Sequence, residues 1–140
     1  MTAQWTIEDR LPTPEEHRRL AESVGWGDAF DWASQPESLA GSTMGAVAVV
    51  GSETVGMARV VGDGVKYFYV QDVAVDPAYQ GHGIGRAILQ HLVDQIAQRA
   101  PAPAFVALFA TPAGESLYRS IGFAPRDMTG LFRIVDPRRH

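Results

Sequence analysis

Apolar residues recur at two spacings along this chain, and the change from one spacing to the other marks where strands give way to helices. Residues 46–50, 54–61 and 66–75 are rich in β-branched and aromatic side chains, and short glycine-containing turns separate them. Runs of this kind predict three consecutive antiparallel strands joined by hairpins. The centre of the chain is therefore expected to form a sheet.

A helix is predicted directly after this sheet. Apolar residues recur there at every fourth position with two more beside them, which is the spacing of one helix face. They are Ile84, Ile88, Leu92 and Ile96, with Leu89 and Val93. We expect this stripe to pack on the sheet.

The remaining segments extend the pattern at both ends of the chain. Thr13, Pro14 and Glu16 form a capping-box sequence, which predicts that a helix begins there. The other predicted elements are strands at 4–8, 104–109, 123–126 and 131–135, a weaker helix at 31–39 and a short helix between Thr111 and Gly122. Together they predict one α/β (α+β) domain over residues 1–140, with a mostly antiparallel sheet of about six or seven strands and about four helices.

Composition and charge narrow the classes of function. The 140 residues carry a net charge of −4, and no face-forming cluster of basic residues appears apart from Arg138-Arg139, so no nucleic-acid partner is expected. The absence of cysteine excludes disulfides, thiolate metal sites and covalent cysteine intermediates. His17, His91 and His140 lack metal-ligand spacing, so no metal is expected either. Without a signal-peptide pattern or a long apolar run, we expect a soluble cytoplasmic protein with no membrane contact.

The segment Gln80-Gly81-His82-Gly83-Ile84-Gly85 lies where the third central strand ends and the helix begins. Amide N–H groups in the first turn of a helix lack partners, and the helix dipole adds about half a positive charge there. Glycine removes the Cβ that would keep a pyrophosphate away from those amides and tolerates positive φ angles. The spacing is neither that of a Walker loop nor that of a dinucleotide fingerprint. The alternative is a tight strand-to-helix turn that binds nothing.

Two motifs resemble one family. The pattern Gln80-x-x-Gly83-x-Gly85 resembles the pyrophosphate-binding segment of the GNAT superfamily of acyl-CoA-dependent N-acetyltransferases. The segment 117–123 is similar to the Leu-Tyr-x-x-x-Gly-Phe segment that follows it in that family, and the order of the predicted elements agrees with the GNAT fold over nearly the whole chain. Thr111 stands where many members have asparagine, so a hydrogen bond made there comes from a hydroxyl.

The resemblance implies acetyl-CoA as co-substrate and a set of residues around it. The backbone of Val73 and Val75 would pair with the pantetheine arm, and an amide near Val73 would polarise the thioester carbonyl as an oxyanion donor. Tyr118 would protonate the departing thiolate. The implied cofactor-binding residues are Val73, Val75, Gln80, Gly81, His82, Gly83, Ile84, Gly85, Arg86, Thr111 and Tyr118.

The general base is harder to assign. Many members use an acidic residue near the middle of the third central strand, where Asp72 is the nearest candidate. Strict alternation places Tyr67, Tyr69, Gln71, Val73 and Val75 on one face of the strand and Asp72 on the other, although a bulge would reverse this. The alternatives are an ordered water chain as the base, and Asp72 as a carboxylate that holds a neighbouring loop.

These observations predict transfer of an acetyl group from acetyl-CoA to a primary amine of a small molecule, by direct attack in a ternary complex. Trp26, Trp32, Tyr67 and Tyr69 are candidates for an aromatic acceptor pocket. The chain also resembles, more weakly, the arylalkylamine branch of the family. Other possibilities are a peptide or protein N-acetyltransferase, an acyl-CoA sensor without turnover, and a binder of another nucleotide. A homodimer is possible.

Overall fold

The computed structural model describes residues 4–138. Contacts divide the chain after Leu108 into two compact units, which we describe separately as the N-terminal unit (residues 4–108) and the C-terminal unit (residues 109–138). Residues 1–3, 139 and 140 lie outside the described residues. They include the start of the segment considered for a signal peptide, and also Arg139 and His140.

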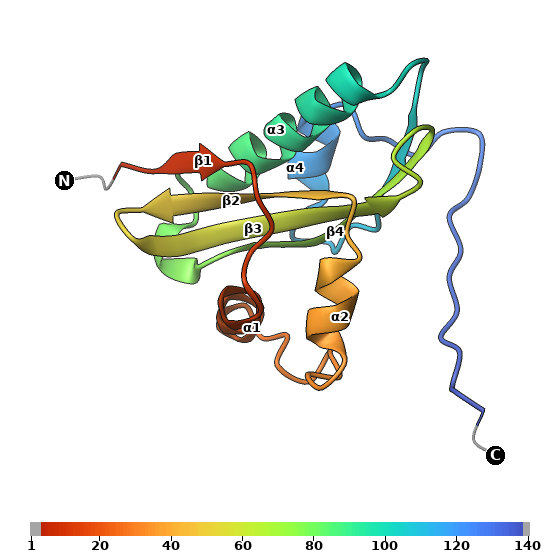
Figure 1. Ribbon diagram of the computed structural model, residues 1–140. Coiled ribbons are helices and arrows are strands. Elements are labelled where there is room, and N and C mark those ends of the chain that lie inside the picture. Colours follow the sequence, from red (N-terminus) through yellow and green to blue (C-terminus); the bar gives the residue numbers. More distant parts are fainter. Residues whose placement is uncertain (1–3, 139–140) are drawn as a thin grey trace. The chain divides into compact units, whose positions relative to one another are not determined.

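A five-stranded sheet is the centre of the N-terminal unit (Figure 1). Its strands follow the order β1-β2-β3-β4-β5, in which neighbours are antiparallel except β4 and β5, which are parallel. The strands are β1 (Thr6–Glu8), β2 (Met44–Val50), β3 (Glu53–Gly62), β4 (Tyr67–Val75) and β5 (Phe105–Ala107). The three central hairpin strands are confirmed.

Helices cover both faces of this sheet. Helix α3 (Ile84–Arg99) lies on one face, and α1 (Pro14–Ser23) and α2 (Gln35–Ala40) lie on the other (Figure 1). The predicted stripe of α3 is buried except for Val93, which is half-buried, and it lies so close to β3 that a Cβ on Gly56 would meet Ile88 Cδ1 at 2.9 Å. A short 3₁₀ helix, η1 (Pro77–Tyr79), connects β4 to the loop before α3. Among the described residues, no helix is long and apolar enough to span a membrane.

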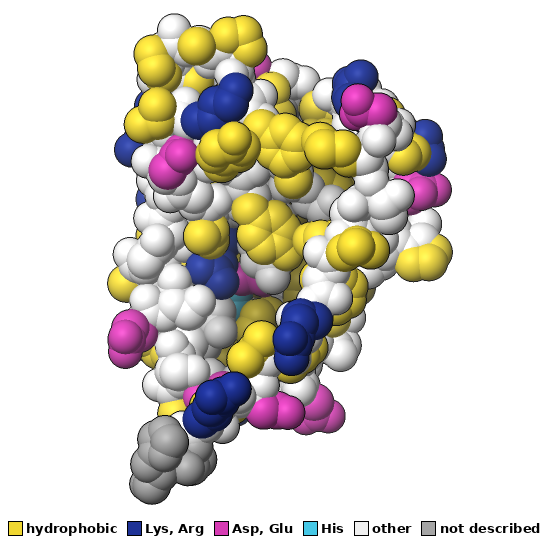
Figure 2. Space-filling model, turned by 90° about the vertical axis from the view of Figure 1, so that its right-hand side faces the viewer, with side chains coloured by type: hydrophobic (Ala, Val, Ile, Leu, Met, Phe, Trp, Pro, Cys, Tyr) yellow, Lys and Arg dark blue, Asp and Glu magenta, His cyan; other side chains and the backbone are white. Residues whose placement is uncertain are grey.

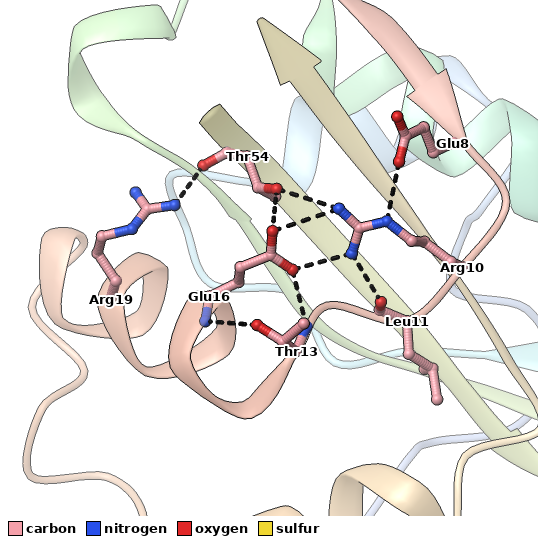
Figure 3. Close-up of polar contacts among 7 residues, drawn as sticks. All are labelled: Glu8, Arg10, Leu11, Thr13, Glu16, Arg19 and Thr54. Atoms are coloured by element: carbon pink, nitrogen blue, oxygen red, sulfur yellow. Dashed lines mark hydrogen bonds and ion pairs between the residues drawn. The ribbon is translucent and has the colours of Figure 1, made fainter. Parts of the chain in front are cut away.

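The start of α1 is fixed by a network of polar contacts (Figure 3). The predicted capping box is present, because the Glu16 N–H donates to Thr13 Oγ1 at 3.1 Å and the Thr13 N–H donates to Glu16 Oε1 at 2.8 Å. Arg10 donates to the same carboxylate at 2.9 Å, and the Thr54 hydroxyl of β3 donates to it as well. Burial alone would raise the pKa of Glu16, but the bonds from Arg10 and Thr54 lower it to about 2.

The C-terminal unit contains helix α4 (Glu115–Ser120), which confirms the predicted short helix, but no strand among its described residues. The predicted strands at 123–126 and 131–135 are therefore wrong, and the sheet has five strands. The apolar residues of these segments do not pair with a strand among the described residues. They are not buried either, because no described residue after Leu108 is buried. Leu131 and Ile134 are 85% and 78% exposed. Figure 2 shows hydrophobic side chains, in yellow, gathered at the surface on one side of the molecule.

Candidate active site

A bulge interrupts the middle of β4. Met57 of β3 pairs with Ala74 of β4, and Arg59 of β3 pairs with Gln71 of β4. The two β3 residues are two positions apart, whereas their β4 partners are three positions apart. One extra residue is thus accommodated in β4, and Asp72 has φ of 58°, the one positive φ among the described non-glycine residues. A left-handed residue is characteristic of the G1 type of β-bulge, in which glycine usually stands at that position.

The bulge changes which side chains share a face of the sheet. Gln71 is opposite Arg59 and Ala74 is opposite Met57, and these two β3 residues, two positions apart, point to the same face. Ala74 and Met57 pack there with Leu20 of α1. Tyr69, Gln71 and Asp72 therefore face α1 and α2 together, whereas Val73 and Val75 face α3. The simple alternation expected from the sequence is wrong beyond Gln71, because the bulge resets it.

Before the bulge, odd-numbered residues of β4 direct their backbone groups toward β3. The Asp63 N–H, at the end of β3, donates to the Tyr67 carbonyl at 3.2 Å. The Lys66 carbonyl, by contrast, accepts from the Phe105 N–H of β5 at 2.8 Å. Successive residues of a strand alternate in this way. If the alternation continued without interruption, the N–H of Val73 would point at β3.

After the bulge the alternation is reversed. The Asp76 N–H donates to the Val55 carbonyl of β3 at 2.8 Å, so that even-numbered residues now face β3. The N–H groups of Val73 and Val75 consequently point away from β3. On that side β5 pairs only with residues 67–69, and no other described strand pairs with β4. Beyond Tyr69, β4 thus presents a sheet edge to which an extended ligand can hydrogen-bond.

The glycine loop follows this edge. Gly81 and Gly83 have φ of 84° and 82°, in the left-handed region that glycine adopts without strain. The first backbone bond of α3 runs from the Ala87 N–H to the Gly83 carbonyl at 3.0 Å, and no described residue accepts from the N–H groups of residues 81–85. A Cβ at Gly81 or Gly83 would meet nothing within 4 Å. The loop is thus an exposed array of amide donors at the start of a sixteen-residue helix.

The other predicted loop residues have distinct positions. Gln80 donates through Nε2 to the Val75 carbonyl at 2.9 Å, so its side chain joins the loop to the end of β4. Ile84 is buried beneath α3 and contributes only its backbone to the loop. His82 and Arg86 are exposed. The structure therefore brings Val73, Val75 and the segment from Gln80 to Arg86 together along one edge.

Asp72 is buried in a cluster of three ionisable side chains. Its Oδ2 accepts from Arg59 Nε at 2.8 Å and lies 2.8 Å from His17 Nε2 of α1. Burial alone would raise the pKa of Asp72, but the hydrogen bonds from His17 and Arg59 outweigh burial and lower it. Asp72 is therefore ionised at neutral pH. No described residue donates to its Oδ1, although the Asp72 side chain as a whole is 3% exposed.

Sequence reasoning missed His17 and Arg59. Arg59 interrupts an otherwise apolar strand, and a charge in a buried strand requires a partner, so this signal was present. His17 shares the buried face of α1 with Leu20 and Ala21. Its partner Asp72 is 55 residues away, a separation at which a single sequence gives no sign of contact.

The predicted aromatic acceptor residues do not form one wall. Trp26 packs against the core cluster beneath α1, and Tyr67 is 57% exposed beside Phe105. Trp32 lies beside the His17 ring at 6.0 Å, together with Phe30 at 5.2 Å. Burial and the negative charge of Asp72 raise the pKa of Tyr69. Trp26 and Trp32 thus pack against the same core cluster, Trp32 and Tyr69 also lie near the ionisable cluster, and Tyr67 is separate from both.

Tyr118 and Thr111 belong to the C-terminal unit. The Tyr118 ring lies over Gly114, where a Cβ would meet Cε2 at 3.0 Å, and it makes an edge contact with Phe123. Burial raises the pKa of the Tyr118 phenol, so that it stays protonated at neutral pH. Thr111 begins the turn before α4 and is exposed. The roles of both residues in catalysis and co-substrate binding stay predictions.

Comparison with known proteins agrees with this geometry. Residues 43–125, which include the bulge, the sheet edge and the glycine loop, match the family described as the acetyltransferase (GNAT) domain. The chain belongs to the GNAT acetyltransferase family. A GNAT-family acetyltransferase from Streptococcus pneumoniae has the same fold, with a TM-score of 0.80 and 29% identity over 94% of this chain and 98% of that one. A probable acetyltransferase from Staphylococcus aureus has a TM-score of 0.83 and 25% identity, over 94% of this chain and 100% of that one.

Curated relatives match over shorter stretches. Serotonin N-acetyltransferase 2 of rice (Oryza sativa subsp. japonica) is 43% identical over 70 residues, which are 50% of this chain and 34% of that protein. The ribosomal protein bS18-alanine N-acetyltransferase of Escherichia coli is 43% identical over 53 residues, 37% of this chain and 36% of that protein. These matches span about a third of each relative, and the two relatives are named for different kinds of acceptor.

Proposed function

We propose that this GNAT protein transfers an acetyl group from acetyl-CoA to a primary amine of a small molecule, by direct attack of the amine. The observation that carries the proposal is the bulge in β4. It turns the Val73 N–H to an open sheet edge that leads directly into an array of unpaired amides.

The residues on this edge fit the two halves of acetyl-CoA. A pantetheine arm is an extended chain with amides, which suits the N–H groups of Val73 and Val75. A pyrophosphate suits the amides of residues 81–85 and the charge of Arg86. The Val75 carbonyl is already engaged by Gln80, so the ligand would use the N–H of Val75 rather than its carbonyl.

Each chemical role has a candidate group in the chain. Bound acetyl-CoA supplies a thioester carbonyl that is open to attack and a thiolate leaving group. The Val73 N–H would donate to the carbonyl oxygen as charge develops there. Asp72, which is ionised and has an unbonded Oδ1, would accept the proton that the amine must lose, and Tyr118 would protonate the departing sulfur.

A thiol-release assay across chemically different amines tests this proposal. The panel contains arylalkylamines, polyamines, aminosugars and peptides with free N-termini, each assayed with acetyl-CoA. Release of free CoA with one of the small amines, and N-acetylated product by mass spectrometry, is the expected result. Activity only on peptides would favour a protein acceptor, the class to which the Escherichia coli relative's name belongs. No turnover with any amine, although acetyl-CoA binds, would overturn the enzyme assignment in favour of a sensor.

A further inference from the structure

We propose that His17 and Arg59 are positioning residues for the acyl-transfer reaction: they hold the backbone of Asp72 in its left-handed conformation and so keep the Val73 N–H on the open edge. The inference rests on the proposed function, because it concerns the amide that would serve as oxyanion donor. It assigns a role to the two residues of the buried cluster that have no direct part in the chemistry.

The bulge needs support because its conformation is unfavourable. A non-glycine residue with φ of 58° is uncommon, and such a residue persists when its surroundings hold it. Aspartate tolerates this region better than most residues do, but no glycine stands at or beside this position. If Asp72 relaxed to an extended conformation, the alternation of backbone groups would be restored, and the Val73 N–H would turn back toward β3.

Two anchors on separate elements hold the Asp72 side chain. Arg59 of β3 donates its Nε to Oδ2, while its Nη1 donates to the Ser38 carbonyl of α2 and to Ser42 Oγ, both at 3.1 Å. His17 of α1 contacts the same oxygen from a side chain that is 1% exposed. Through one carboxylate oxygen, therefore, α1, the end of α2 and β3 are all joined to the bulge.

His17 has no route to the reacting atoms. Its Nδ1 is buried and has no hydrogen-bond partner among the described residues, and its ring is enclosed by Phe30 and Trp32. An imidazole sealed in this way does not contact an acceptor amine. Its available action is on Asp72, through the bond from Nε2.

The test compares substitutions at His17 with the same substitutions at His91. His91 makes an equivalent contact, Nε2 to Asp9 Oδ1 at 2.9 Å, on the exposed side of α3, and serves as the matched control. We expect His17→Leu to lower kcat by about 10- to 100-fold, with KM for acetyl-CoA changed less than about threefold. Because the His17 bond also lowers the pKa of Asp72, the acid limb of the pH–rate profile should move to higher pH in His17→Leu, and the loss in kcat that comes from geometry should persist on the plateau above it. His17→Gln, which keeps an N–H donor, should recover much of the rate, and His91→Leu should leave it unchanged.

A second measurement does not depend on turnover. In the ¹⁵N-labelled protein without substrate, the amide resonances of residues 72–75 should shift or broaden in His17→Leu and in Arg59→Lys, but not in His91→Leu. Unchanged resonances in a folded His17→Leu variant would overturn the proposal, as would a wild-type kcat on the plateau of the pH profile. If no amine is acetylated but these resonances move, the proposed function fails and the positioning role stands. If His17→Leu does not fold, His17→Gln and Arg59→Lys carry the same comparison.

Discussion

Asp72 combines a left-handed backbone with a buried, ionised side chain, and both properties depend on the same two neighbours. Arg59 supplies a charge and His17 a further polar contact to one oxygen. The lowered pKa that follows makes Asp72 a weak base, although its Oδ1 accepts no hydrogen bond from a described residue. The cluster therefore orients Asp72 but lowers its affinity for a proton. The chemistry then depends more strongly on the group that protonates the departing thiolate, which is the role proposed for Tyr118.

Tyr118→Phe tests that donor. The substitution removes one hydroxyl and keeps the ring contacts with Gly114 and Phe123, so the fold should be unaffected. We expect kcat to fall by about 100-fold while acetyl-CoA affinity changes little, because general acid catalysis typically contributes a factor of that size. Since burial raises the pKa of Tyr118, phenol ionisation should halve the wild-type rate only above about pH 10. Steady-state kinetics and acetyl-CoA titration of both proteins measure these quantities. An unchanged kcat would remove Tyr118 from the mechanism.

At the scale of elements, the junction of β4 and α3 depends on backbone conformation that side chains do not supply. Gly83→Ala should raise KM for acetyl-CoA by about tenfold and lower stability by about 1 kcal/mol, because an alanine at φ of 82° is strained even though its Cβ has space. Gly41→Ala is the control, since Gly41 ends α2 with an ordinary φ of −80°. Kinetics and urea unfolding measure the two effects. An unchanged KM in Gly83→Ala would show that the loop does not hold the co-substrate.

Helix α1 carries a separate prediction about pH. Glu16 has a pKa lowered to about 2 in the folded protein, against about 4.5 in an unfolded chain, so its contribution is complete above pH 4.5 and is lost as pH falls toward 2. Glu16→Gln should cost about 2 kcal/mol at pH 7 and should flatten the fall in stability across this window. Urea unfolding from pH 2 to 7 measures both. Glu22→Gln is the control on the same helix, because its contact with Arg18 is exposed and should matter by less than about 0.5 kcal/mol.

Sequence reasoning succeeded where an element is specified by its own residues. The capping box at Thr13, the stripe of α3 and the two glycine turns between the central strands are local signals, and each is present in the structure. The bulge could not be placed, because the conformation of Asp72 is held by His17, 55 residues away. The strand expected at 131–135 failed for a related reason: its apolar pattern is real, but a strand forms only where a partner edge is paired with it.

At the scale of the whole molecule, the two units differ in what stabilises them. The N-terminal unit has a continuous core on both faces of its sheet, whereas the C-terminal unit has no buried residue among those described, so its 30-odd residues lack a core of their own. The residues proposed to bind acetyl-CoA lie mostly in the N-terminal unit, with Tyr118 and Thr111 in the other.

The proposed acetyl-CoA site predicts how different nucleotides affect the thermal stability of the protein. Binding to the folded state alone adds about 2.7 kcal/mol when the ligand is present at a hundred times its Kd. Acetyl-CoA and CoA should therefore raise Tm by several degrees, whereas ATP and NAD at the same concentration should raise it little, because neither has a pantetheine arm to pair with the edge at Val73 and Val75. Differential scanning fluorimetry on the wild type and on Gly83→Ala measures this, and a tenfold weaker affinity in the variant should remove about half of the acetyl-CoA effect. A shift of equal size with ATP would show that the loop recognises phosphate alone, and the strand-pairing half of the site would then have to be abandoned.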